Sequence, residues 1–127
     1  MAQHHILVVE DEPVSLQSVV DCLMHAGFGV EAAADGREAL NKLKSLPHKF
    51  SAIVLDRVMP FMGGMELMQH IKKDSQLKEI PVIMLTGLDE HDDIADAVES
   101  GVFDYLTKPI DPPILIDLLQ EAIKNRS

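Results

Sequence analysis

Short apolar runs alternate along the chain with stretches in which apolar residues recur every three or four positions. The short runs are rich in β-branched residues and predict buried strands, whereas the longer spacing predicts helices that each bury one face. We expect strands at 5–9, 28–33, within 51–60 ending at Asp56, 80–85 and 103–107. We expect helices from Pro13 to about Gly27, at 37–46, at about 65–73, at 92–100 and at 113–124.

Five consecutive strand–helix units predict an α/β fold with a parallel sheet. Right-handed crossover connections place the helices on both faces of such a sheet. The chain has 127 residues, which is the size of one domain. We therefore expect a single domain over 1–127, with an ordered core from about residue 5 to about residue 125 and no output domain.

The composition restricts the partners and the compartment. The chain has 11 Lys and Arg against 21 Asp and Glu, and its formal net charge of -10 repels nucleic-acid phosphates and anionic lipids. Cys22 is the only cysteine, so no internal disulfide forms, and its helical pattern predicts an inert buried thiol. The first residues, MAQHHILVV, do not form a basic region followed by a secretory apolar core, and no apolar run approaches roughly 20 residues. We expect a cytoplasmic domain that binds neither nucleic acid nor membrane.

Asp56 ends an apolar strand, and this position predicts a functional carboxylate. A buried charge without a partner is costly, so Asp56 must lie at the strand exit, near solvent or a cation. Chemistry in parallel sheets collects at the carboxyl ends of the strands. The same edge should also receive Glu10, Asp11, Thr86 and Lys108, which follow or end other expected strands.

This set of side chains is suited to phosphoryl transfer. Glu10, Asp11 and Asp56 would repel one another unless a cation joins them, and Mg²⁺ prefers oxygen ligands. The Thr86 hydroxyl and the Lys108 ammonium can hold phosphoryl oxygens, and carboxylates can act as nucleophiles that form aspartyl phosphates. The residues therefore predict Asp56 as the acceptor of a phosphoryl group.

Four motifs resemble those of the receiver domain of two-component response regulators, whose fold is shared with the chemotaxis regulator. They are VVEDEP at 8–13, LDRVMP at 55–60, MLTG at 84–87 and DYLTKP at 104–109. The resemblance covers nearly the entire chain, and each motif lies at the end of an expected strand. It implies a flavodoxin-like doubly wound fold with strand order 2-1-3-4-5.

The resemblance also implies roles for individual residues. Asp56 would accept the phosphoryl group, and Glu10, Asp11, Asp56 and the backbone carbonyl of Val58 would hold Mg²⁺ or Mn²⁺. The donor would be a phosphohistidine on a sensor histidine kinase or a histidine phosphotransfer protein. The domain would assist its own phosphorylation and dephosphorylation, and it would not turn over an external substrate.

Further implied roles concern the response to phosphorylation. Thr86 and Lys108 would contact the phosphoryl group, Thr86 and Tyr105 would switch, and the Lys108–Pro109 peptide bond would be cis. The face made by the fourth helix, fifth strand and fifth helix would then control a downstream protein or an output domain. The domain would be a monomer or a phosphorylation-dependent dimer.

Four positions depart from the family pattern. Glu10 stands where the family often has Asp, and its longer side chain is expected to reach the metal through water. Gly63 replaces an Asp before Gly64, so the third helix is expected to lose a side-chain cap. Val58 and Leu88 place apolar side chains near the site, where we expect them to hinder an attacking water.

Two other functions compete with the phosphorylation switch. A phosphatase with an aspartyl nucleophile would want a general acid two residues after Asp56, and Val58 cannot serve. A phosphate-independent interaction module of the same fold stays open. Tyr105 can be a core residue instead of a switch, and the acidic run at 89–99 can be a solvated helix face or a docking face.

Overall fold

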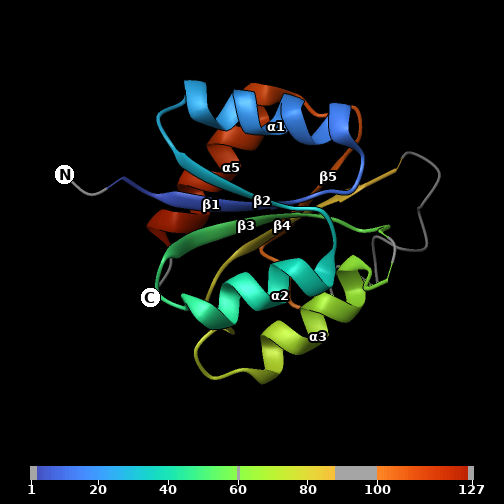
Figure 1. The fold of residues 1–127 in the computed structure, drawn as a ribbon. Helices are drawn as coiled ribbons and strands as arrows, with labels where there is room; N and C mark the ends of the chain where they lie inside the picture. Colours follow the sequence, from blue (N-terminus) through green and yellow to red (C-terminus); the bar gives the residue numbers. More distant parts are fainter. Residues whose placement is uncertain (1–2, 60, 88–99, 126–127) are drawn as a thin grey trace.

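The computed structural model describes residues 3–59, 61–87 and 100–125. Its sheet has five strands in the order β2-β1-β3-β4-β5, and every neighbouring pair is parallel, which confirms the expected fold class (Figure 1). The strands are β1 His5–Val9, β2 Gly29–Ala33, β3 Phe50–Asp56, β4 Val82–Thr86 and β5 Asp104–Thr107.

Helices cover both faces of the sheet. They are α1 Pro13–His25, α2 Gly36–Ser45, α3 Gly64–Lys73 and α5 Pro112–Lys124. In Figure 1, α1 and α5 lie on one side of the sheet, and α2 and α3 lie on the other. The helix expected at 92–100 falls outside the described residues except for Ser100, which is in a turn.

The two faces have separate hydrophobic cores because side chains alternate across a strand. In β3, Ala52 and Val54 belong to the cluster under α1 and α5, whereas Ile53 and Leu55 belong to the cluster under α2 and α3. All four are fully buried. The central strands are therefore apolar on both faces, which is why their runs are continuous in the sequence.

Local contacts fix the helix starts near the carboxyl edge of the sheet. The Glu12 carboxylate accepts hydrogen bonds from the backbone N–H groups of Val14 and Ser15, which caps α1. No side-chain hydrogen bond caps α3 at Gly63, as its sequence predicts. A Cβ on Gly64 would lie 2.8 Å from the Asp56 carbonyl oxygen, so only glycine lets α3 begin this close to the end of β3.

Several local expectations are wrong. β4 begins at Val82, because Ile80 donates its N–H to the Leu77 carbonyl at 3.0 Å in the preceding turn and Pro81 has no N–H. Met24, expected on the inner face of α1, is 60% exposed. Cys22 is only half-buried, although burial still raises the pKa of its thiol.

None of the helices in the described part of the chain has the length and apolar character to cross a bilayer.

Candidate functional site

Three carboxylates meet at the carboxyl edge of the sheet, and we call Glu10, Asp11 and Asp56 the acidic cluster. Val9 of β1 pairs with Leu55 of β3, so the residues that follow them, Glu10 and Asp56, lie side by side. One carboxylate oxygen from each of the three residues lies within 4.8 Å of the others. The register of two parallel strands thus produces the cluster that the sequence predicts.

Burial differs sharply within the acidic cluster. Glu10 is 1% exposed and Asp56 is 7% exposed, whereas Asp11 is exposed. The cluster therefore opens to solvent on the side of Asp11. A cation or a phosphoryl group can approach the cluster from this open side.

Lys108 supplies the positive charge that lies closest to the cluster among the described residues. Its Nζ is 3.2 Å from Asp56 Oδ2 and 3.4 Å from Glu10 Oε2. Thr107 pairs with Thr86 across β5 and β4, and the Lys108 N–H donates to the Thr86 carbonyl at 2.8 Å. This backbone link holds Lys108 at the edge of the sheet. The site has one ammonium group and three carboxylates, so negative charge is in excess.

The excess of negative charge changes the acidity of Glu10. Burial raises the pKa of Glu10 to about 7, a hydrogen bond and repulsion from Asp56 add to the rise, and Lys108 opposes it. Burial lowers the pKa of Lys108, but the Asp56 and Glu10 carboxylates outweigh burial and raise it overall. Lys108 is therefore a firmly charged ammonium, and Glu10 takes up a proton near neutral pH when no metal is bound.

Thr86 adds a polar atom without a partner. Its residue is 1% exposed, and its Oγ1 has no hydrogen-bond partner in the part of the chain that the structure describes. A buried hydroxyl without a partner costs about 1 to 3 kcal/mol. Such a group at the end of β4 is suited to a ligand that brings a hydrogen-bond partner.

The donor set fits a divalent magnesium ion. Mg²⁺ takes oxygen ligands, keeps several waters and binds through one or two carboxylates together with phosphate oxygens. The acidic cluster offers three carboxylates close together, and its open side leaves room for water. No nitrogen or sulfur ligand belongs to this group of side chains in the described residues, which makes zinc less suited.

The other residues expected at the site lie around it. Val58 follows Asp56 by two residues and its side chain is 60% exposed. Tyr105 pairs with Met84 across β5 and β4, and it is half-buried against the core under α2 and α3. The Lys108–Pro109 peptide bond is cis. Leu88 lies outside the described residues.

The loop between β3 and α3 contains a feature that the sequence reasoning missed. Phe61 has a φ of +66° and is 75% exposed, and the Arg37 guanidinium lies 4.3 Å from the centre of its ring. The left-handed conformation costs a residue with a bulky side chain roughly 1–2 kcal/mol. A cation–π contact at an exposed site returns about 0.5–1 kcal/mol. In the sequence, only the neighbouring Gly63 and Gly64 indicate an unusual turn at this position.

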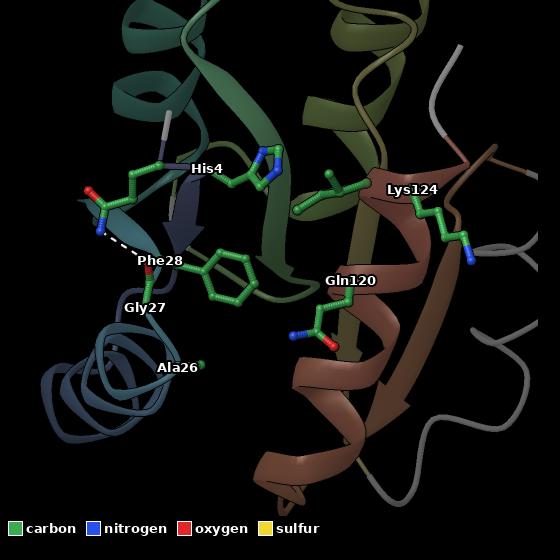
Figure 2. A pocket seen from close by; sticks show the side chains of 8 residues that line it. His4, Ala26, Gly27, Phe28, Gln120 and Lys124 are labelled. Atoms are coloured by element: carbon green, nitrogen blue, oxygen red, sulfur yellow. Dashed lines mark hydrogen bonds between the residues drawn. The ribbon is translucent and has the colours of Figure 1, made fainter. Parts of the chain in front are cut away.

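Two cavities lie away from this edge. A pocket of about 410 Å³ is lined by Phe28, by His4 before the start of β1, and by Gln120 and Lys124 near the end of α5 (Figure 2). It therefore lies at the amino edge of the sheet, opposite the acidic cluster. A wider groove of about 610 Å³ runs between α1 and α5. Neither includes a residue of the cluster.

Comparisons with known proteins agree with the geometry. Residues 6–120 match the family model described as response regulator receiver domain. The phosphate regulon transcriptional regulatory protein of Escherichia coli is 35% identical over 122 residues, which are 96% of this chain and 52% of that protein. The chain spans about half the length of the first curated relatives that it matches.

Two solved structures are similar over nearly the whole chain. A chemotaxis response regulator of Vibrio cholerae is 35% identical with a TM-score of 0.86, and the match covers 95% of this chain and 99% of that one. The receiver domain of a sensor histidine kinase from Pseudomonas aeruginosa is 29% identical with a TM-score of 0.89, over 98% and 100% of the chains. That structure has a magnesium ion coordinated in its active site cleft.

Proposed function

Because the chain belongs to the response regulator receiver domain family, we propose that Asp56 accepts a phosphoryl group from a phosphohistidine. The donor is a sensor histidine kinase or a histidine phosphotransfer protein. The proposal rests above all on the position of Asp56, whose carboxylate lies beside those of Glu10 and Asp11 and 3.2 Å from the Lys108 ammonium. A phosphate-independent interaction module would have no use for this unbalanced charge.

Glu10, Asp11, Asp56 and the Val58 backbone carbonyl would hold Mg²⁺ at this edge. The magnesium structure of the Pseudomonas aeruginosa domain supports this choice of ion. The ion supplies neutralisation of the negative charge that the carboxylates and the phosphoryl oxygens bring together. Manganese, with similar ligand preferences, would serve as well.

The chain's own residues would act as follows. An Asp56 carboxylate oxygen attacks phosphorus, the phosphorus–oxygen bond forms, and the phosphorus–nitrogen bond to the donor histidine breaks. The electron pair of the broken bond stays on the imidazole nitrogen. Lys108 neutralises one phosphoryl oxygen, and the unpaired Thr86 hydroxyl donates a hydrogen bond to another.

This reaction should make Asp56 the only phosphorylated residue. Intact-mass analysis after incubation with acetyl phosphate and Mg²⁺ should show one added phosphoryl group in the parent and none in Asp56→Asn. Asp117→Asn, which changes an exposed aspartate of α5, is the matched control and should behave like the parent. Equal modification of Asp56→Asn and the parent would contradict the assignment, and an unmodified parent would favour the interaction module.

The output would pass through Thr86 and Tyr105. A phosphoryl group that draws the Thr86 hydroxyl inward leaves space for the half-buried Tyr105 ring, so phosphorylation shifts an existing equilibrium. The affected face includes β5 and α5, together with the helix expected at 92–100, of which only Ser100 is among the described residues. A downstream protein or an output domain would read this face. We also propose that the domain works in the cytoplasm and that, in a longer protein, it would control the activity of the output domain.

The switch predicts a local change in amide hydrogen exchange. Protection in β5 and α5 should differ between the free protein and the protein with beryllofluoride, a phosphoryl mimic, and Mg²⁺. Protection in β2 should stay the same, because β2 lies at the other edge of the sheet. Identical protection of β5 and α5 in both states would rule the switch out while leaving the phosphorylation of Asp56 intact.

A further inference from the structure

Phe61 lies in the loop that follows the proposed phosphoacceptor, Asp56. It follows Asp56 by five residues, in the loop that also exposes Val58. The Gly36 N–H donates to the Met62 carbonyl at 3.1 Å, and a Cβ on Gly36 would lie 2.6 Å from that oxygen. The loop is therefore seated firmly against α2, and Phe61 projects from a supported backbone.

The contacts of Phe61 inside the domain do not offset its backbone conformation. The left-handed conformation costs more than a surface cation–π contact returns, and three-quarters of the residue stays in water. Glycine would adopt this φ without strain. The balance points to a contact outside the domain, where burial of the ring would add the missing stabilisation.

Arg37 has unused hydrogen-bonding capacity beside the ring. Its guanidinium lies over Phe61, and no carboxylate in residues 3–59, 61–87 or 100–125 forms an ion pair with it. An Arg fork prefers a carboxylate, which it binds through two parallel hydrogen bonds. Aromatic and Arg side chains together are typical of residues that dominate binding energy at interfaces.

We propose that Phe61 and Arg37 form an anchor for the protein that brings the phosphohistidine to Asp56. This inference rests on the proposed function. The donor imidazole must reach Asp56, so the donor protein must cover this edge of the sheet and the loop beside it. The surface of the donor would offer an aliphatic patch for the Phe61 ring and an adjacent carboxylate for Arg37. Phe61 and Arg37 would determine which donor is recognised, and neither would take part in the chemistry.

The test compares a small donor with a protein donor. The variants are Phe61→Ala and Arg37→Gln, with Leu46→Ala as a control, because Leu46 is an exposed apolar residue at the far end of α2. The donors are acetyl phosphate and a phosphorylated histidine phosphotransfer domain chosen because it loads the parent. With the protein donor, kcat/KM should fall about tenfold in both variants, mainly through a higher KM. With acetyl phosphate, all four proteins should react at the same rate.

A second measurement tests the premise. Phe61→Gly should raise the urea midpoint above that of the parent, because glycine relieves the backbone strain. A lower midpoint would show that Phe61 serves the fold and would overturn the inference.

Three kinetic outcomes would also overturn it. They are an unchanged kcat/KM with the protein donor, an equal loss with both donors, and a parent that reacts with acetyl phosphate but with no histidine phosphodonor. A parent that does not react with acetyl phosphate would instead contradict the proposed function.

Discussion

Two charged clusters on the same sheet have opposite balances. At the carboxyl edge, the acidic cluster has three carboxylates, and the Lys108 ammonium pairs with two of them, those of Glu10 and Asp56. In β2, the Glu31 carboxylate lies near the ammonium groups of Lys49 and of Lys42, at 3.9 Å, and Lys42 also lies 3.8 Å from the Glu38 carboxylate. The acidic cluster has fewer ammonium groups than carboxylates, whereas the carboxylates of the second cluster have enough ammonium groups to balance their charge. This difference separates a group of charges that favours binding of a cation from a group that stabilises the fold.

The pKa shifts of the carboxylates also differ between the two clusters. Burial and Asp56 raise the pKa of Glu10 to about 7, so the folded state disfavours its charged form. A hydrogen bond from Lys49 lowers the pKa of Glu31, despite burial, and the charges of Lys49 and Lys42 add to the effect. At neutral pH the contacts of Glu31 with Lys49 and Lys42 therefore stabilise the folded protein. The acidic cluster instead destabilises it until a cation binds.

The largest expected effect is a loss of stability as pH rises in chelator. The folded pKa of Glu10 is about 7 and its unfolded value is near 4.5, so between these values the folded state holds the proton more tightly. The contribution of Glu10 to the free energy of unfolding is therefore full below about pH 4.5 and declines until about pH 7, by about 3 kcal/mol in total. The measurement is the free energy of unfolding by urea across this range in parent and Glu10→Gln.

The difference between the two proteins isolates the contribution of Glu10, because every other ionisable group is present in both. Relative to Glu10→Gln, the parent should lose stability steadily as pH rises. A constant difference from pH 4.5 to pH 7 would mean that Glu10 is not perturbed as described.

A smaller effect should separate Lys108 from Lys49. Lys108→Met removes the ammonium that lies against Asp56 and Glu10, and it should lower the free energy of unfolding in chelator at pH 7.5 by about 1–2 kcal/mol. Lys49→Met is the matched control at Glu31. Because the side chains of this ion pair are half-buried, this variant should lose about 0.5–1 kcal/mol of unfolding free energy. Urea melts of both variants provide the comparison. Equal losses would show that the balance of charge does not distinguish the two clusters.

The sequence predicts the fold and the acidic cluster for the same physical reason. Strands buried on both faces give continuous apolar runs, and their carboxyl ends meet at one edge of a parallel sheet. The residue that follows each run is then placed almost without further information. Asp56, Glu10 and Lys108 come together in this way, and so does Thr86 at the end of β4.

Features that depend on particular tertiary contacts could not be predicted in this way. Nothing in the apolar pattern brings Lys42 and Lys49 to Glu31, since these contacts depend on how α2 and the following loop pack beside β2. The left-handed Phe61 was missed because the conformation usually selects Gly or Asn. Met24 follows the helical spacing, but the face of α1 that the sheet covers is narrower than the pattern suggests.

The central claim is that the acidic cluster destabilises the free protein and is relieved by a cation. Its most direct test is a urea melt of parent and Asp11→Asn in chelator and in Mg²⁺ at fixed ionic strength. Asp11→Asn should be more stable than the parent in chelator. Mg²⁺ at a hundredfold excess over Kd should stabilise the parent by roughly 2.7 kcal/mol and the variant by much less. A variant less stable than the parent in chelator, with no midpoint moved by Mg²⁺, would contradict the account.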